Sequence, residues 1–235
     1  MLTSLTSLKQ DLQGQADPVR ARHSQRFFKT GKGEYGEGDK FLGLTNPQIR
    51  TLAKKYRDLD LADLEKLLGS KIHEHRLISL FILVDQFHRA NEQARRQIYD
   101  FYLKNATRVN NWDLVDSSAH KIVGWYLEDK DRAILYKLAK SKNLWEKRIS
   151  IIATFWFIKN GELNDSLKIA EILLKDEHDL IHKAVGWMLR ETGKKDVAIL
   201  RQFLDKHVLD MPRTMLRYAI EKLPKKERKN YLSKF

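Results

Sequence analysis

The chain repeatedly places apolar residues three and four positions apart, with polar and charged residues between them. Examples are Leu77, Leu80, Phe81 and Val84, then Ile151, Ile152 and Phe155, and then Ala184, Trp187 and Met188. This spacing puts the apolar side chains on one face of an α-helix. Only four prolines occur, and no convincing run of alternating strand residues is present. The pattern therefore predicts an almost entirely helical protein.

The predicted helices also resemble one another. The segment "HKIVGWYLE" at 120–128 recurs as "HKAVGWMLRE" at 182–191, and the apolar segments at 75–84, 147–157 and 212–223 have a similar basic onset. The first basic residues of the five segments are separated by 45, 27, 35 and 30 positions, and they are Arg76, Lys121, Arg148, Lys183 and Arg213. Irregular spacing in this range is typical of stacked helix pairs of the HEAT or armadillo kind. We therefore expect one all-α domain over residues 1–235, a right-handed α-solenoid of HEAT-like repeats.

The charge of the chain indicates that the predicted helical scaffold also has a binding surface. Lysine and arginine number 44 against 31 aspartates and glutamates, a net charge of +13, which favours a polyanionic partner, foremost nucleic acid. Basic residues near the start of a helix are unfavourable, because the helix dipole is positive at its N-terminus. An external anion bound there offsets this repulsion. One helix of each pair lines the concave face of a solenoid. We expect that face to be basic and to bind a phosphate backbone.

Two kinds of sequence feature are missing, which limits the chemistry and the cellular compartment that we expect for this protein. The chain has no cysteine, which excludes disulfides, thiolate nucleophiles, zinc–thiolate sites and iron–sulfur clusters of its own. It has no run of eighteen apolar residues and no signal-peptide core at its N-terminus. We therefore expect a cytoplasmic protein, associated with the nucleoid when it is bound to DNA, without a membrane partner.

Five of the eleven glycines lie in one short segment, at Gly31, Gly33, Gly36, Gly38 and Gly43. The segment lacks the preceding strand and the Gly-Lys-Ser/Thr ending of a P-loop. We expect a mobile loop that leads to a helix, with Thr45 or Asn46 as N-cap and Pro47 in the first turn. Exposed amides there could hold one phosphate.

The segment "HDLIH" at 178–182 resembles part of a zinc-protease pattern. Asp179 replaces the usual glutamate and no third ligand is evident, so we expect no metal site, and exposed or helix-capping roles for His178 and His182. The "HEH" segment at 73–75 is a weaker candidate still. A metallohydrolase using His178 and His182 remains an alternative, and it would be sensitive to a chelator.

The stretch "NNWDLVDSSAHKIVGWYL" places Trp112 and Asp116 four residues apart, which is one face of a helix. Asp116 also fits a simpler role as an acid that stabilises the helix start, and Asp113 fits that role or an N-cap. The predicted apolar stripe beside them consists of Val115, Ala119, Ile122 and Tyr126. We expect Trp112 and Trp187 to be exposed on the basic face, and Trp125 and Trp156 to lie in the core.

Four segments taken together resemble the AlkD family of DNA alkylation-repair glycosylases, which are built from HEAT-like repeats. They are "FLGLTNPQIR", "NNWDLVD", "NLWEKRISI" and "HKAVGWMLRE", in the family's order and over nearly the whole chain. The resemblance implies removal of positively charged N3- or N7-alkylated purines from duplex DNA without base flipping and without a cofactor. It also implies that Asp116 is the catalytic carboxylate, that Trp112 and Trp187 contact the sugar, and that Arg148 is the active-site arginine.

A carboxylate suits this reaction because departure of the base leaves positive charge on the sugar. We expect a monomeric, monofunctional enzyme whose partner is duplex DNA containing alkylated purines. The expected DNA contacts are Thr45, Arg50, Arg76, Lys183, Arg190 and Arg213. A non-catalytic HEAT-like module that binds nucleic acid or an acidic protein remains the main alternative, since helical repeats are often binding scaffolds.

Overall fold

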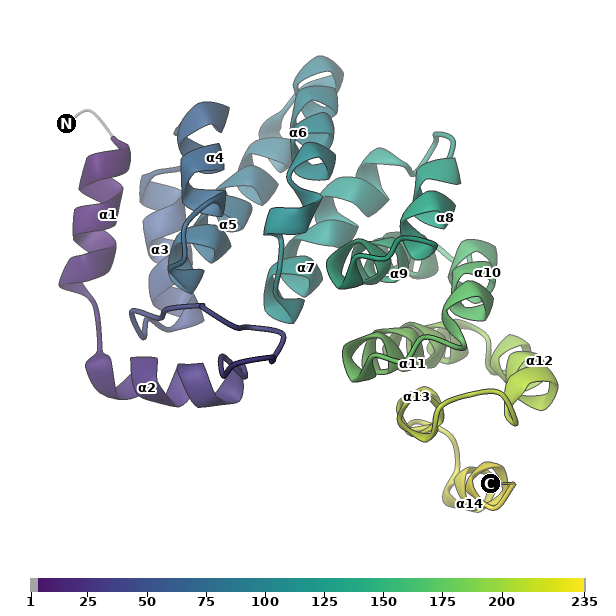
Figure 1. The fold of residues 1–235 in the computed structure, drawn as a ribbon. Helices are drawn as coiled ribbons and strands as arrows, with labels where there is room; N and C mark the ends of the chain where they lie inside the picture. The colour runs from purple at the N-terminus through teal and green to yellow at the C-terminus, as the bar shows by residue number, and fades with distance from the viewer. Residues whose placement is uncertain (1–3, 235) are drawn as a thin grey trace. The chain divides into compact units, whose positions relative to one another are not determined.

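The computed structural model describes residues 4–234, and helices dominate this range, as the sequence predicts (Figure 1). The only strand-like pairing among these residues is an isolated parallel bridge between Lys40 and Ile72. No helix within residues 4–234 is long and apolar enough to cross a membrane. The chain divides into two compact units, residues 1–118 and residues 119–235.

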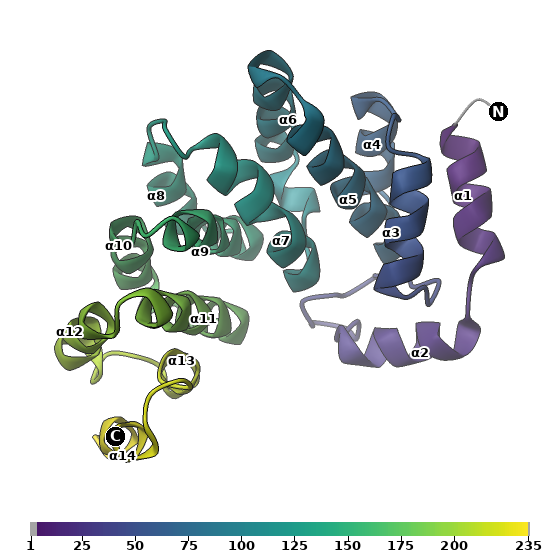
Figure 2. The ribbon, with the colours of Figure 1, turned by 180° about the vertical axis from the view of Figure 1, so that it is seen from behind.

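The first unit is organised around one long buried helix. Its elements are α1 (Leu5–Gly14), α2 (Pro18–Phe27), α3 (Asn46–Lys55), α4 (Leu61–Leu68), α5 (His73–Arg89), α6 (Glu92–Lys104), the short 3-10 turn η1 (Ala106–Arg108) and α7 (Trp112–Ala119). α5 packs against α3, α4 and α6, and α1 packs against α3 (Figures 1 and 2). Ile78, Leu80 and Ile82 of α5 are fully buried, so this helix forms the core of the unit.

Local signals in the sequence set the helix starts that matter for the site. Asp17 caps α2 by accepting the backbone N–H groups of Val19 and Arg20, and Pro18 follows it. Thr45 is the N-cap of α3, and its backbone N–H donates to the Gln48 side chain at 2.9 Å. The predicted cap at Thr45, with a proline in the first turn, is therefore confirmed.

The second unit consists of two layers of paired helices. Its elements are the π-helical turn η2 (His120–Gly124), α8 (Ala133–Ala139), α9 (Leu144–Lys159), α10 (Asn164–Leu173), α11 (Asp179–Lys195), α12 (Val197–His207), α13 (Arg213–Ala219) and α14 (Lys225–Leu232). Within this unit η2, α9, α11 and α13 pack side by side in one layer. α8 and α10 pack on α9, and α10 and α12 pack on α11. The predicted fold of stacked helix pairs is confirmed in this arrangement.

The repeated Gly-Trp pair marks the points where neighbouring helices approach most closely. A Cβ atom on Gly124 would lie 2.3 Å from the carbonyl oxygen of Ala153 in α9. A Cβ atom on Gly186 would lie 2.5 Å from the carbonyl oxygen of Met215 in α13. The glycine in each copy of the repeat therefore allows one helix to contact the backbone of the next.

The tryptophans that follow these glycines lie at the edge of the core. Trp125 stacks on Trp156 with ring centroids 5.0 Å apart and an interplanar angle of 13°. Both side chains stay partly exposed, so the prediction that they are core residues is wrong. Their stacking covers one face of each indole, and the Nε1 atom of Trp156 is buried. Trp145 of α9 is the buried tryptophan, with 7% of its surface exposed.

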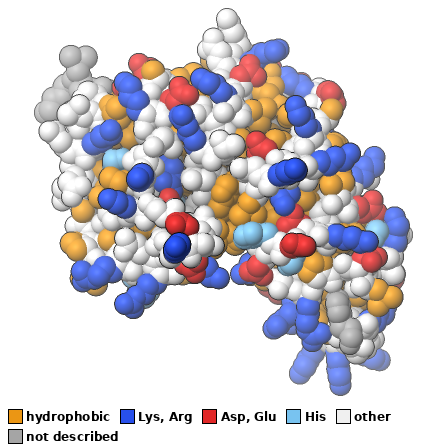
Figure 3. Space-filling model, in the orientation of Figure 1, with side chains coloured by type: hydrophobic (Ala, Val, Ile, Leu, Met, Phe, Trp, Pro, Cys, Tyr) orange, Lys and Arg blue, Asp and Glu red, His pale blue; other side chains and the backbone are white. Residues whose placement is uncertain are grey.

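Basic side chains gather over α14 in the second unit, in the lower part of Figure 3. The exposed basic residues of this helix are Lys225, Lys226, Arg228 and Lys229. They escaped the sequence prediction because they do not stand at the start of an apolar segment. A single domain over residues 1–235, a right-handed solenoid and a concave basic face stay predictions.

The close approach at Gly186 yields a stability prediction. Gly186→Ala should lower the free energy of unfolding by about 1–3 kcal/mol, since the added methyl group meets the backbone of α13. Gly14→Ala is the matched control, because Gly14 ends α1 and a Cβ atom there has no neighbour within 4 Å. Denaturant unfolding of both variants measures the difference. Equal stability of the two variants would contradict the packing role of Gly186.

Candidate active site and nucleic-acid interface

The start of α7 carries the first pair of predicted catalytic residues. Asn111 is fully buried, and its side-chain oxygen accepts the backbone N–H of Trp112 at 2.8 Å. Trp112 is half-buried and stacks on Phe28 with ring centroids 5.3 Å apart and an interplanar angle of 17°. Phe27 meets the same indole edge-on at 5.9 Å. The indole of Trp112 is thus held by aromatic contacts at the end of α2, and it is less exposed than the sequence predicts.

Asp116 lies one helical turn after Trp112 and is partly exposed. Its neighbours Val115 and Ala119 are fully buried, as the predicted apolar stripe requires. Burial raises the pKa of the Tyr102 phenol, and the negative charge of Asp116 raises that pKa further. The Asp116 carboxylate therefore lies beside a buried core and is still accessible to solvent. A carboxylate that acts on an external substrate needs this combination.

Arg148 and Trp187, the other two predicted catalytic residues, belong to the second unit. Arg148 of α9 is 4% exposed and donates a hydrogen bond to the backbone carbonyl of Leu180. Trp187 of α11 is half-buried, and its ring lies 5.6 Å from that of Phe155. The indole Nε1–H of Trp187 donates to Glu191 at 3.1 Å, which fixes the orientation of the ring. Trp112 and Asp116 are thus brought together on α7, and Trp187 and Arg148 are each held within the second unit.

Three of the predicted DNA contacts lie at the surface. Arg50 is exposed, and its guanidinium lies 4.0 Å from the centroid of the Phe81 ring. Arg213 is exposed at the start of α13. Lys183 is partly exposed and pairs with Asp179 at 2.7 Å. An exposed ion pair of this kind contributes little to stability, so the lysine can exchange it for a phosphate at small cost.

The other three predicted contacts are engaged within the protein. The Thr45 hydroxyl donates to Gln48 at 2.8 Å, and Arg190 pairs with Glu191 and Glu221. Arg76 is 3% exposed and is paired with Asp39 at 2.5 Å. The expectation that Arg76 lies on a DNA-binding surface is therefore corrected. Arg76 stands near the start of a helix, as the sequence suggests, but its guanidinium forms a buried ion pair with Asp39, which is 37 positions earlier in the sequence.

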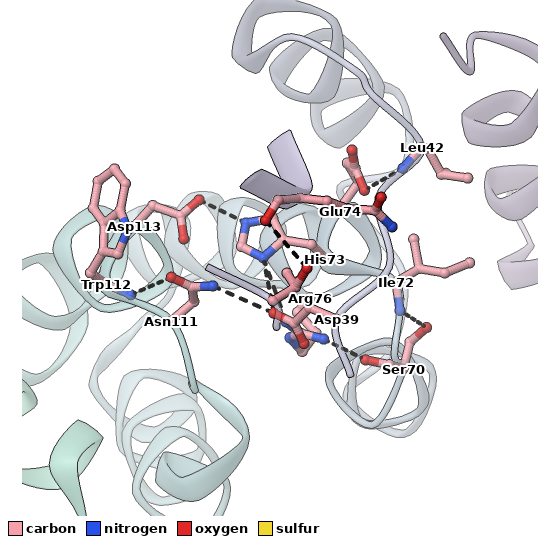
Figure 4. A network of polar contacts seen from close by, with 12 residues as sticks. Asp39, Leu42, Ser70, Ile72, His73, Glu74, Arg76, Asn111, Trp112 and Asp113 are labelled. Carbon is pink, nitrogen blue, oxygen red and sulfur yellow. Dashed lines mark hydrogen bonds and ion pairs between the residues drawn. The ribbon is translucent and has the colours of Figure 1, made fainter. Parts of the chain in front are cut away.

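A buried polar network beside α7 escaped the sequence prediction (Figure 4). The Nε2 atom of His73 lies 2.8 Å from Oδ2 of Asp113, and its Nδ1 atom lies 3.8 Å from Oδ2 of Asp39. Asp113 is thus the partner of a buried histidine, and the role of N-cap suggested by the sequence is not the one its side chain fills. The clearest sequence signal was the "HEH" segment, where adjacent titratable residues stand at the start of an apolar helix.

The neighbouring charges of this network set the protonation of His73 and Asp39. Burial lowers the pKa of His73, and the positive charge of Arg76, whose Nη2 atom lies 3.5 Å from Nδ1 of His73, lowers it further. The charge and hydrogen bond of Asp113, with the nearby carboxylate of Asp39, outweigh both effects and raise this pKa to about 9. Burial favours the neutral form of Asp39, whereas its contacts with His73 and Arg76 hold the pKa of that carboxyl below its usual range. At neutral pH His73 and Arg76 are therefore the cations of the network, and Asp39 and Asp113 are its anions.

Aromatic rings enclose the histidine of this network. The ring of His73 lies 4.9 Å from Phe28 and 4.8 Å from Phe41. A cavity of about 280 Å³ opens here, and its lining includes Phe27, Phe28, Phe41, His73, Trp112 and Asp113. His73 and Asp113 of the network therefore share one pocket with the Trp112 indole in the first unit.

The glycine-rich segment holds its own carboxylates. The N–H of Gly31 donates to Glu34 at 2.8 Å, and the N–H of Gly33 donates to Glu37 at 2.8 Å. The N–H of Gly43 donates to the buried carboxylate of Glu74 at 2.8 Å. These amides are already paired with anions of the protein, which argues against the expected phosphate site in this segment.

The two histidines of the "HDLIH" segment have local roles. His178 caps α11, and its Nδ1 atom accepts the backbone N–H of Leu180 at 3.1 Å. The Nε2 atom of His182 faces the backbone carbonyl of Asp176. Across residues 4–234 no group of three or more histidine, cysteine, aspartate or glutamate side chains is placed to hold a metal ion. The helix-capping role predicted for these histidines is confirmed for His178.

Comparisons with known proteins place this geometry in a family. The structure is similar to that of a predicted DNA alkylation repair enzyme from Enterococcus faecalis, with a TM-score of 0.69 and 16% sequence identity over 90% of this chain and 98% of that chain. At this identity the similarity shows the fold alone. No curated protein matches the sequence significantly. The family model described as DNA alkylation repair enzyme matches residues 8–223, and the chain therefore belongs to the DNA alkylation repair enzyme family.

Proposed function

We propose that this protein is a monofunctional DNA glycosylase that excises positively charged N3- and N7-alkylated purines from duplex DNA. Membership of a DNA alkylation repair family supports an enzyme that acts on alkylated DNA. The observation that carries the proposal is the partly exposed carboxylate of Asp116, one turn after Trp112 on the anchored helix α7. Asp116 is proposed as the catalytic residue.

The proposed reaction breaks the bond between the sugar C1′ and the alkylated purine. The electron pair of this bond goes to the purine, which leaves as a neutral base, so positive charge develops on the deoxyribose. The Asp116 carboxylate stabilises that charge and orients the water that attacks C1′. The attacking water gives up one proton to bulk water as the new C–O bond forms, and an abasic site results. Since the alkylated base is already a good leaving group, we propose that it reacts without being flipped out of the duplex.

Trp112 and Trp187 are each proposed to contact the sugar during this reaction. An indole face near the oxocarbenium-like sugar would contribute about 0.5–2 kcal/mol by cation–π attraction. Phe28 holds the plane of Trp112, and Glu191 holds that of Trp187, so neither ring has to be ordered during the reaction. Arg148 is buried and uses one donor on Leu180. We propose that its positive charge favours a DNA phosphate near the lesion.

DNA binding is proposed to rest on the basic residues that lie at the surface. Arg50, Lys183 and Arg213 keep this role from the predicted set, and Thr45 and Arg190 stay proposed contacts of lesser weight. The exposed basic residues of α14 join them: Lys225, Lys226, Arg228 and Lys229. Such contacts release counterions from DNA and make binding strongly dependent on salt.

The catalytic role of Asp116 predicts that Asp116→Asn binds duplex DNA nearly as well as the wild type but loses excision of 7-methylguanine and 3-methyladenine. Asparagine keeps the size of the side chain and removes the charge that stabilises the sugar cation. Released base is measured from methylated duplex DNA, in parallel with and without a chelator. Asp100→Asn, on exposed Asp100 of α6, is the control for loss of one negative charge and should keep full activity.

Different outcomes separate the alternatives. Unchanged excision by Asp116→Asn would contradict its role, and chelator-sensitive excision would favour a metalloenzyme using His178 and His182. No release by the wild type either with or without the chelator, together with salt-sensitive DNA binding, would favour the non-catalytic binding module.

The binding surface yields a separate prediction. Arg213→Ala should weaken DNA binding and reduce the slope of log K against log salt by about 1, the contribution of one phosphate contact. Excision measured at saturating protein should change little. Arg96→Ala is the matched control, because Arg96 is 72% exposed on α6 and is not among the proposed contacts. Equal salt slopes for both variants and the wild type would exclude Arg213 from the interface.

A further inference from the structure

The buried histidine of the first unit joins three segments that are distant in the sequence. His73 is the first residue of α5, and its backbone N–H donates to the carbonyl of Lys40 at 2.8 Å. Its side chain reaches Asp113 on α7 at 2.8 Å and Asp39, in the segment before α3, at 3.8 Å (Figure 4). The side chain is 3% exposed. This histidine thus ties the start of α7 to the start of α5 and to the glycine-rich segment.

Two further contacts connect the same network to Trp112. Asp39 accepts a hydrogen bond from the side chain of Asn111 at 3.4 Å, and Asn111 accepts the backbone N–H of Trp112. Phe28 contacts both the His73 ring and the Trp112 indole, at 4.9 Å and 5.3 Å. A change at His73 can therefore reach Trp112 through Asp113, through Asn111 and through Phe28.

The charge balance of the network depends on the proton of His73. Asp39 and Asp113 supply two negative charges, and Arg76 and protonated His73 supply two positive charges. Glu74 of α5 lines the same pocket, but its carboxylate is held by the N–H groups of Leu42 and Gly43. Loss of the His73 proton would leave two partly buried carboxylates with Arg76 as the remaining cationic side chain of the network. Such an imbalance is costly in a buried site and favours rearrangement.

We propose that His73 is a positioning residue for base excision, which fixes the start of α7 and the Trp112 indole through its contacts with Asp113, Asp39 and Phe28. This inference rests on the proposed glycosylase function and adds to it a residue that does not touch the substrate. Asp113 is likewise a positioning residue, which acts through its bond to His73.

The protonation of His73 gives the proposal a measurable pH dependence. Its pKa is raised to about 9, above the 6.5 of an ordinary histidine. The stabilisation from the charged form is therefore complete below pH 6.5 and is lost as the pH rises through about 9. The Trp112 indole should therefore be held less firmly as the pH rises through about 9.

The test compares the wild type with His73→Gln, since glutamine can still donate a hydrogen bond to Asp113 but carries no charge. Single-turnover release of 7-methylguanine is measured at intervals from about pH 6.5 to 10, with spontaneous loss of the base subtracted. In the wild type the rate should fall with a midpoint near pH 9. His73→Gln should be about ten-fold slower at neutral pH, because small displacements of positioned groups cost rate, and it should lack this midpoint.

A second measurement reports on Trp112 without catalysis. The protein contains five tryptophans, and incorporation of 5-fluorotryptophan gives each of them a ¹⁹F NMR signal. The signal that disappears in Trp112→Phe is that of Trp112. The Trp112 signal should shift with a midpoint near pH 9 in the wild type and should not shift in His73→Gln. Asp113→Asn keeps the histidine and should move the midpoint down toward 6.5. His88→Gln, the same change on exposed His88 of α5, should behave like the wild type.

The outcomes separate this inference from the proposed function. If the wild type excises and His73→Gln has the same rate and pH profile, the positioning role is overturned. If the wild type does not excise, the glycosylase proposal fails, and the Trp112 signal alone decides whether His73 controls that indole. A Trp112 signal that is insensitive to pH near 9 in the wild type overturns the inference in either case.

Discussion

The burial of one side of α7 is the constraint on which the candidate site depends. Leu114, Val115 and Ser118 are excluded from solvent, so α7 cannot turn about its axis without exposing them. Trp112 and Asp116, one turn apart, keep partial exposure on this anchored helix. An indole and a carboxylate are thereby offered to an external substrate without the entropic cost of ordering a loop. The same anchoring brings Asp113 to the buried histidine of α5.

Some basic residues of the chain are buried and bind other groups of the protein, whereas others lie at the surface. Arg76 and Arg148 are buried and hydrogen-bonded to groups of the protein, so neither adds simply to a DNA-binding surface. The exposed basic residues proposed to contact DNA include Arg50, Arg213 and those of α14. A net charge of +13 is therefore a sound indication of a polyanionic partner but a poor guide to which residues contact it.

Features set by neighbouring residues could be predicted from the sequence. Helical periodicity predicted the fold class, and the sequence of Thr45 and Pro47 predicted the start of α3. Both predictions were possible because caps and amphipathic faces depend on residues within a few positions of one another. The resemblance pointed to Trp112 and Asp116, which α7 brings together. The His73 network could not be predicted, since its partner Asp113 is 40 positions away. The stacking of Trp125 on Trp156 escaped prediction for the same reason.

The measurement that tests the central claim most directly is the fate of methylated duplex DNA incubated with the wild-type protein. A glycosylase releases free 7-methylguanine and leaves an equal number of abasic sites, both of which mass spectrometry can count. Release of the intact base with matching abasic sites is the predicted result. DNA that is bound but keeps its methylated purines would contradict the assignment of an excising enzyme.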